Sequence, residues 1–151
     1  FLTSEKGIGD AYAGLGYAAF ALTMTAGRLM GDTIVKRLGA RLVIVLGGLF
    51  AAAGMALATL APNWESALLG YALVGAGCSN IVPVLYTAVG KQTVMPEHIA
   101  VPAITTLGYA GILAGPAAIG FIAHASSLGA AFLLITAMLI AVAISGRILR
   151  V

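Results

Sequence analysis

The chain has 151 residues, of which 61% are apolar and only 9% charged, and its mean hydropathy is +1.06. A soluble domain carries about 25% charged residues, so this composition excludes a soluble globular domain with a polar surface. The net charge of +3 comes from 8 basic and 5 acidic residues. In so apolar a chain the placement of these charges matters more than their sum, and we expect no nucleic-acid partner.

Five apolar runs follow one another along the chain. They cover residues 11–30, 42–60, 67–89, 101–123 and 128–149. Each is long enough to cross a bilayer, because about 20 helical residues at 1.5 Å rise span roughly 30 Å of hydrocarbon. None of the short links between them is long enough for a soluble domain. The sequence therefore predicts an all-α membrane protein, a multi-span helical bundle that takes up residues 1–151 and has the lipid bilayer as its surroundings.

The first two runs are joined by the most highly charged stretch, GRLMGDTIVKRLGAR, at residues 27–41. Basic residues occupy alternate links and the C-terminal end: Lys36, Arg37, Arg41, Lys91, Arg147 and Arg150. The other links hold Glu65 and His124 and no Lys or Arg. By the positive-inside rule, the N-terminus of this segment is predicted to lie outside and its C-terminus in the cytoplasm.

Polar side chains gather in the third run, in the stretch GAGCSNIVPVLY at residues 75–86. An amide inside the membrane is costly, so Asn80 marks a candidate ligand site near the bilayer centre. The alternative is a structural role, in which Asn80 hydrogen-bonds a neighbouring helix. Pro83 in this run and Pro116 in the fourth each remove a backbone donor and favour a kink.

Small residues are frequent, with 20 glycines in the chain. Gly27 and Gly31 form one GxxxG pair, and Gly111 and Gly115 form another. Lipid tails are as apolar as the helices, so the hydrophobic effect does not drive helix association in a membrane. Close contact between membrane helices depends instead on such small residues. The pattern predicts a tightly packed bundle.

Chemistry-bearing patterns are scarce. All five acidic residues lie at or beyond the ends of the predicted runs, and no HExxH motif or serine with a nearby base is visible. We therefore expect no catalytic residue, no metal site and no cofactor, and a protein that is not an enzyme. A channel would need a charged ring or a carbonyl filter, and this reading ranks below transport.

The charged stretch at residues 27–41 resembles motif A of the major facilitator superfamily, although Asp32 follows Gly27 by five positions where the usual pattern has four. The run GYAGILAGPAAIG (residues 108–120) is similar to the eleventh helix of that superfamily, and LLGYALVGAGCSNIVPVLY (residues 68–86) to its tenth. The link KQTVMPEH resembles a bacterial sugar-permease branch that includes the fucose permeases. The resemblance implies a gating motif made of Gly27, Arg28, Asp32, Arg37, Gly39 and Arg41.

The resemblance also implies which part of a transporter this is. The five predicted spans could correspond to helices two to six of the superfamily. However, the fourth helix of the first half usually carries an Arg where this chain has Tyr71. We therefore expect helices eight to twelve, the C-terminal half of a permease in the bacterial inner membrane. Its partner would be the missing N-terminal half of the same transporter.

The function implied is secondary active transport of a small polar, sugar-like solute by alternating access. The predicted solute contacts, on helices that line the cavity in this superfamily, are Asn80, Tyr109, Tyr17, Ser79 and Thr105. The alternatives are an efflux carrier for an amphipathic compound and a membrane scaffold that transports nothing.

Overall fold

The computed structural model describes residues 2, 3, 7, 9, 12 and 14–148. The α-helices in this part are α2 (Leu15–Leu29), α3 (Gly31–Leu38), α4 (Ala40–Leu60), α5 (Trp64–Cys78), α6 (Ile81–Lys91), α7 (Glu97–Ala125) and α8 (Leu128–Ile148). The predicted all-α helical bundle is confirmed.

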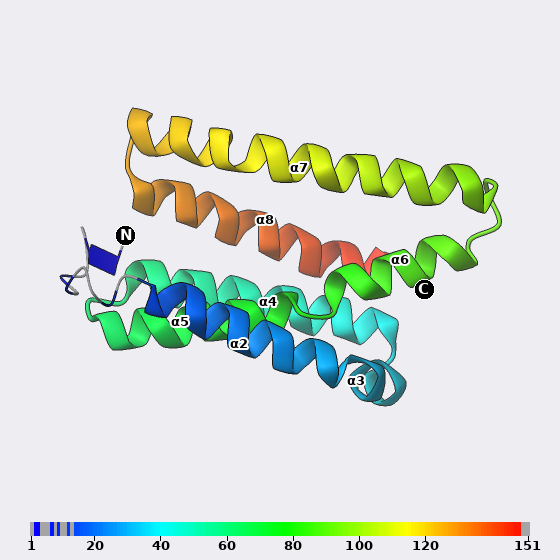
Figure 1. The fold of residues 1–151 in the computed structure, drawn as a ribbon, viewed down its shortest axis with the longest axis horizontal. Coiled ribbons are helices and arrows are strands. Elements are labelled where there is room, and N and C mark those ends of the chain that lie inside the picture. The colour runs from blue at the N-terminus through cyan, green and yellow to red at the C-terminus, as the bar shows by residue number, and fades with distance from the viewer. Residues whose placement is uncertain (1, 4–6, 8, 10–11, 13, 149–151) are drawn as a thin grey trace.

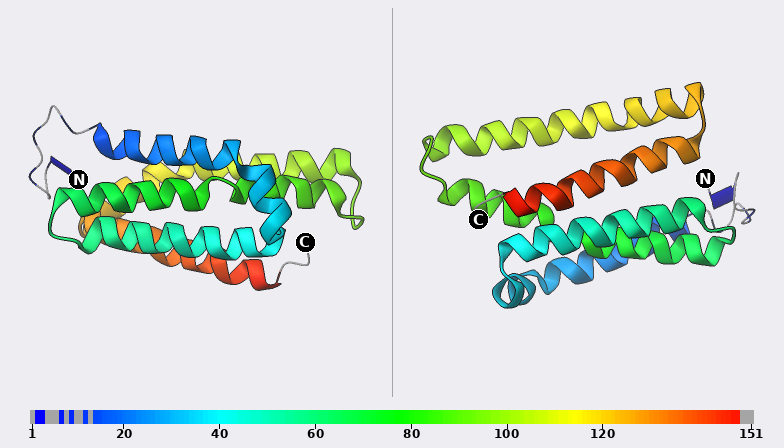
Figure 2. Two further views of the ribbon diagram at one scale, coloured as in Figure 1. Left: turned by 90° about the horizontal axis from the view of Figure 1, so that it is seen from below. Right: turned by 180° about the vertical axis from the view of Figure 1, so that it is seen from behind.

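The long helices run side by side along one axis (Figure 1). α4 lies at the centre of the packing and makes its most extensive contacts with α5 and α8, while α2 packs on the other side of α5. α7 lies outermost, beyond α8. α3 is short and crosses the end of the bundle at a steep angle to α2 and α4 (Figure 2).

Among the residues that the structure describes, four helical segments are long and apolar enough to cross a membrane: Ala40–Leu60, Trp64–Lys91, Glu97–Ala125 and Leu128–Arg147. They correspond to the last four predicted runs. For the first predicted run, 11–30, the structure has the 15-residue helix α2. At 1.5 Å per residue α2 is about 22 Å long, shorter than the hydrocarbon layer. Residues 11 and 13 lie outside the described residues, so this fifth crossing stays a prediction.

Glycines bring α4 and α5 into backbone contact. A Cβ built on Gly70 would lie 2.5 Å from the carbonyl oxygen of Gly54, and one on Gly54 would lie 2.5 Å from that of Gly70. Gly47 and Gly77 form a second reciprocal pair at the same distance of 2.5 Å. These two contacts, seven residues apart along each helix, set how closely the two helices approach.

A hydroxyl joins α5 to α2. Thr23 Oγ1 donates to the carbonyl oxygen of Ala72 at 2.8 Å. Gly75 lies against the Phe20 carbonyl and has no room for a side chain. Interhelical hydrogen bonds of this kind contribute roughly 0.6 to 1.7 kcal/mol in membranes, so small residues and one hydroxyl fix this interface.

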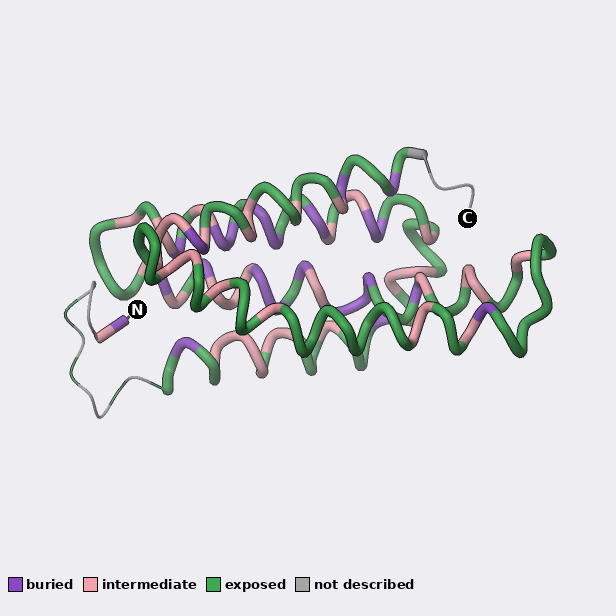
Figure 3. Tube along the Cα trace, turned by 90° about the horizontal axis from the view of Figure 1, so that it is seen from above, coloured by how far each residue is buried: buried purple, intermediate pink, exposed green. Residues whose placement is uncertain are grey.

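The two predicted GxxxG pairs differ in what they contact. Gly27 and Gly31 lie against the side chains of Ser79 and Asn80. By contrast, in the part of the chain that the structure describes, a Cβ on Gly111 or Gly115 would meet nothing within 4 Å. Figure 3 shows the same division, with burial gathered among the inner helices and α7 exposed along most of its length. The spacing of Gly111 and Gly115 therefore does not serve helix packing among the described residues.

The proline in the third predicted run coincides with a break. α5 ends at Cys78 and α6 begins at Ile81, which places Ser79 and Asn80 between two helices. Pro83 has no N–H for the carbonyl of residue 79 and its ring clashes with that carbonyl, so the continuous helix is disfavoured at this point. In α7 the helix continues through both Pro102 and Pro116.

The described basic residues all belong to one end of the bundle. α3, the link from α6 to α7 and the end of α8 lie together there in Figure 1, and the links from α4 to α5 and from α7 to α8 lie at the opposite end. Arg28, Lys36, Arg37, Arg41, Lys91 and Arg147 occur in or next to the first group. This arrangement is the one that the predicted orientation requires.

Candidate functional site

Two helix interruptions meet near the basic end of the bundle. One separates α2 from α3 at Met30, and the other separates α5 from α6 at Ser79 and Asn80. The side-chain nitrogen Nδ2 of Asn80 donates to the carbonyl oxygen of Gly27 at 2.9 Å and to Ser79 Oγ at 3.0 Å. Ser79 Oγ in turn donates to the carbonyl oxygen of Ala76 at 2.7 Å. A small polar network therefore joins the two interruptions.

Both polar side chains of this network are buried, Ser79 with 2% and Asn80 with 6% of its surface exposed. Burial without partners would cost each group several kcal/mol in an apolar medium, and the hydrogen bonds remove that penalty. The two amide hydrogens of Asn80 are both used, one by Gly27 and one by Ser79.

The glycines of the predicted gating motif make room for this network. A Cβ on Gly27 would lie 2.5 Å from Ser79 Oγ. A Cβ on Gly31 would overlap Asn80 Oδ1. The glycines at 27 and 31 are thus explained by the side chains of the α5–α6 interruption.

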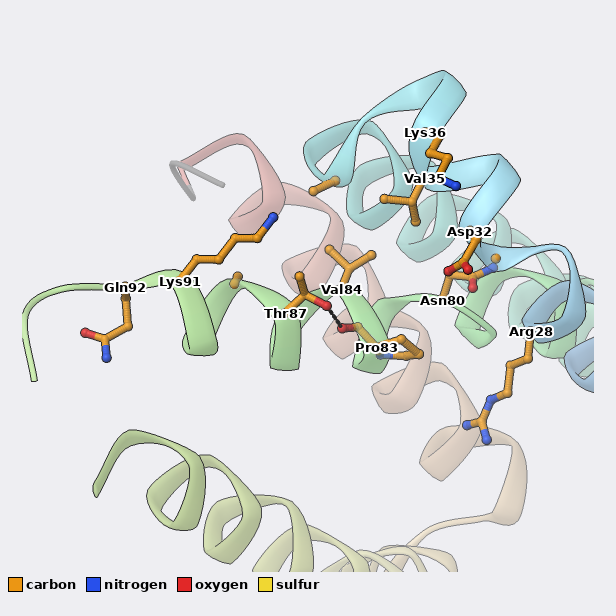
Figure 4. Close-up of a pocket in the computed structure, with 13 residues that line it drawn as sticks. Arg28, Asp32, Val35, Lys36, Asn80, Pro83, Val84, Thr87, Lys91 and Gln92 are labelled. Carbon is orange, nitrogen blue, oxygen red and sulfur yellow. Dashed lines mark hydrogen bonds between the residues drawn. The ribbon is translucent and has the colours of Figure 1, made fainter. Parts of the chain in front are cut away.

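A cavity of about 520 Å³ opens beside the network, between α3 and α6 (Figure 4). Its polar lining consists of Arg28, Asp32, Lys36, Asn80, Thr87, Lys91 and Gln92, and its apolar lining includes Val35, Pro83 and Val84. In Figure 4 Asp32 lies beside Asn80, while Arg28, Lys36 and Lys91 extend from three different helices. The lining holds three cations and one carboxylate, so the cavity is electropositive and favours anionic or strongly polar groups.

The rest of the gating motif lies further along the chain. Gly39 has φ +81° and ψ +153°, a conformation that favours glycine, and it separates α3 from α4. Arg37 is exposed on the last turn of α3. Arg41 Nη2 donates to the carbonyl oxygen of Arg147 at 2.8 Å and so caps the C-terminal end of α8. Arg41 therefore links α4 to α8 in this structure.

The three described acidic side chains share one kind of position. Asp32, Glu65 and Glu97 each lie in the first turn of a helix, α3, α5 and α7 respectively. A negative charge there interacts favourably with the helix dipole. Within the residues that the structure describes, no three His, Cys, Asp or Glu side chains come together to hold a metal ion.

The predicted solute contacts lie in separate places. Ser79 and Asn80 belong to the buried network. Thr105 on α7 is half-buried and lies 3.0 Å from the hydroxyl of Tyr86 on α6. Tyr17 is 76% exposed beside a second cavity of about 410 Å³, and Tyr109 on α7 is 64% exposed. Direct contact of these residues with a solute stays a prediction.

Most lining residues of the first cavity were not in the predicted site, and three of these lie on one face of α6. Pro83, Thr87 and Lys91 follow one another at intervals of four on α6, which places them on one helix face. That spacing is readable from the sequence. The fact that this face meets α3 is not, because it depends on how the two interruptions pack.

Comparison with known proteins finds one matching family model and several similar membrane proteins. The family model of the Major Facilitator Superfamily matches residues 1–151. The chain is 53% identical to an uncharacterised MFS-type transporter of Yersinia pestis over 97% of its own length and 38% of the relative. It is 36% identical to the membrane protein MosC of Rhizobium meliloti, over 95% of the chain and 35% of MosC.

A third relative, an uncharacterised transporter of Sinorhizobium fredii, is 27% identical over 99% of the chain and 40% of the relative. The chain therefore spans well under half the length of each of these three proteins. No solved structure matches it. With its whole length matched by the family model and its fold made of membrane-length apolar helices, the chain belongs to the major facilitator superfamily.

Proposed function

We propose that this chain is the C-terminal half of a secondary transporter that moves a small polar, sugar-like solute across the bacterial inner membrane by alternating access. The observation that carries the proposal is the family match over all 151 residues. Members of this superfamily are built from two halves, and the solute binds near the midplane where the halves meet. The N-terminal half would come from the rest of the protein.

The exposed hydroxyls support a polar solute. Tyr17 on α2 and Tyr109 on α7 present hydroxyl groups on mostly apolar helices, and neither side chain is covered within the described part of the chain. A phenol can both donate and accept a hydrogen bond, which suits the hydroxyl groups of a neutral sugar or polyol. A face of α7 that carries Tyr109 and open glycines is where the other half would approach.

Uptake measurements on the complete protein test this proposal. Proteoliposomes would be offered a panel of radiolabelled neutral hexoses, pentoses and polyols, with empty liposomes as the control. We expect accumulation or counterflow of at least one of them, and a loss of that signal in the Tyr109→Phe variant if Tyr109 contacts the solute. Absence of transport for the whole panel, with folded protein present, would contradict the proposed solute class.

A second candidate is efflux of an amphipathic compound. It is favoured by the cavity at the other end of α2, which is lined by Tyr17, Phe20, Tyr71 and Phe132. Aromatic walls suit apolar rings more than sugar hydroxyls. Export of a fluorescent lipophilic cation, with no sugar uptake, would favour this candidate. A membrane scaffold would give neither signal.

Neutralising Asp32 should shift the balance between inward-open and outward-open states. Asp32 is the one carboxylate among the residues that line the electropositive cavity, and its loss leaves Arg28, Lys36 and Lys91 without an opposing charge there. Because Asp32 is exposed, its attraction to these cations is weak. We therefore expect Asp32→Asn to change the ratio of inward-open to outward-open states by up to about fivefold, toward inward-open. Distances between spin labels at the basic ends of the two halves measure this ratio.

Glu97→Gln is the matched control, since Glu97 also lies in the first turn of a helix but not at the cavity. An equal shift in both variants would mean that the effect comes from net charge rather than from the motif.

A further inference from the structure

The contacts around Asn80 connect two segments that are otherwise loosely joined. α3 carries Asp32 and Arg37 of the gating motif, and α6 carries the opposite wall of the cavity. Each is separated from its preceding membrane helix by an interruption, at Met30 for α3 and at Ser79 and Asn80 for α6. Both segments can therefore change direction without breaking a regular helix.

Asn80 holds these two interruptions together. Its Nδ2 donates to the Gly27 carbonyl in the last turn of α2, and its Oδ1 lies where a side chain at Gly31 would be. Ser79 fills the corresponding space at Gly27. Two glycines, one turn apart, are thus matched to two consecutive polar side chains, and a rotation of α3 about Met30 that carries Gly31 toward α6 would displace Asn80.

The middle of α6 contacts α7. The hydroxyls of Tyr86 and Thr105 lie 3.0 Å apart, and α6 packs more extensively against α7 than against α5. Movement of Asn80 would for this reason be carried through α6 to α7, the helix with Thr105 and Tyr109.

We infer that Gly27, Gly31, Ser79 and Asn80 form a shared hinge, in which Asn80 is a positioning residue that transmits movement of the charged helix α3 to α6 and α7. The inference deepens the proposed function, because it names the mechanical link between the gating motif and the helix expected to face the solute. It does not require Asn80 to touch the solute.

A double-mutant cycle tests the hinge in the complete protein. Spin labels at Thr33→Cys on α3 and Gly90→Cys on α6, both exposed positions, report the distance across the hinge, with native cysteines replaced. Asn80→Ala removes the bond to Gly27 and should change the ratio of the distance populations by about three- to twentyfold, as expected for one interhelical hydrogen bond in a membrane. Gly31→Ala should displace Asn80 and also disturb the distribution.

The combined variant Gly31→Ala/Asn80→Ala is the decisive one. Because the overlapping side chain is gone, its distance distribution should match that of Asn80→Ala alone. Additive effects of the two substitutions would overturn the inference. If Gly31→Ala alone does not fold, recovery of folded protein in the combined variant supports the inference, and failure of both overturns it.

Val82→Ala is the matched control, because Val82 is exposed on α6 two residues beyond Asn80. We expect it to leave the distance distribution unchanged, and an effect as large as that of Asn80→Ala would overturn the specific role of the amide. The readout needs no solute. A coupled hinge in a protein that takes up none of the sugars would contradict the proposed function and leave the hinge standing.

Discussion

Replacement of Gly70 by alanine is expected to destabilise the protein by about 1–3 kcal/mol, because the new Cβ would be forced into the backbone of α4. It would lie 2.5 Å from the Gly54 carbonyl oxygen and 2.6 Å from the Ala58 nitrogen. Backbone atoms cannot turn aside as a flexible side chain can, so α4 and α5 would have to separate. Equilibrium unfolding of the complete protein in mixed micelles of a mild detergent and dodecyl sulfate measures the loss.

The same substitution at Gly90 is the matched control. Among the described residues its Cβ would meet only the Glu97 carboxylate, at 3.9 Å. Alanine is favoured over glycine within a helix by roughly 1 kcal/mol, so Gly90→Ala should leave stability unchanged or slightly raised. If both variants unfolded at the same denaturant concentration, close contact between α4 and α5 would not be what holds these helices.

Replacement of Pro83 by alanine is expected to raise stability and slow transport. Proline inside a helix costs about 3 kcal/mol, and its removal allows α5 and α6 to join across Ser79 and Asn80. A continuous helix cannot bend at that point, so we expect transport by the complete protein to fall about tenfold or more. Hydrogen exchange of the backbone amides at residues 80–82 should slow in parallel, since those amides precede the bond from Val84 N to the Asn80 carbonyl and would gain helical partners.

Pro116→Ala is the comparison for this prediction, because α7 already continues through Pro116. It should alter exchange locally and change transport much less. Unchanged transport in Pro83→Ala, together with slowed exchange at residues 80–82, would show that the interruption is not used in the cycle.

Much of the fold follows from the sequence because membrane crossing imposes simple requirements. Apolar length predicted the segments that became α4, α5 with α6, α7 and α8, and alternating basic links predicted that the charges gather at one end. The helix of α3 was expected as part of a link. Its apolar positions Ile34 and Val35 pack against Val43, Ile44 and Val84, contacts that arise only when the bundle is assembled.

The candidate site was less predictable. The sequence showed that Asn80 was unusual but left open whether its amide meets a solute or a neighbouring helix, and the decision depends on which helix lies opposite. The opposite position is occupied by Gly27, whose carbonyl accepts the hydrogen bond. Glycine spacing also left open what each glycine contacts. Gly27 and Gly31 lie against polar side chains, whereas Gly54 and Gly70 lie against the backbone of the facing helix.

The central claim is that the helices cross a lipid bilayer with the basic end in the cytoplasm, and labelling of single cysteines tests it most directly. Arg37→Cys in α3 and Asn63→Cys in the link before α5 are exposed and belong to opposite ends of the bundle. A maleimide that cannot cross membranes should label Asn63→Cys in spheroplasts and Arg37→Cys only in inverted vesicles. Labelling of both positions from the same side, or the reverse pattern, would contradict the claim.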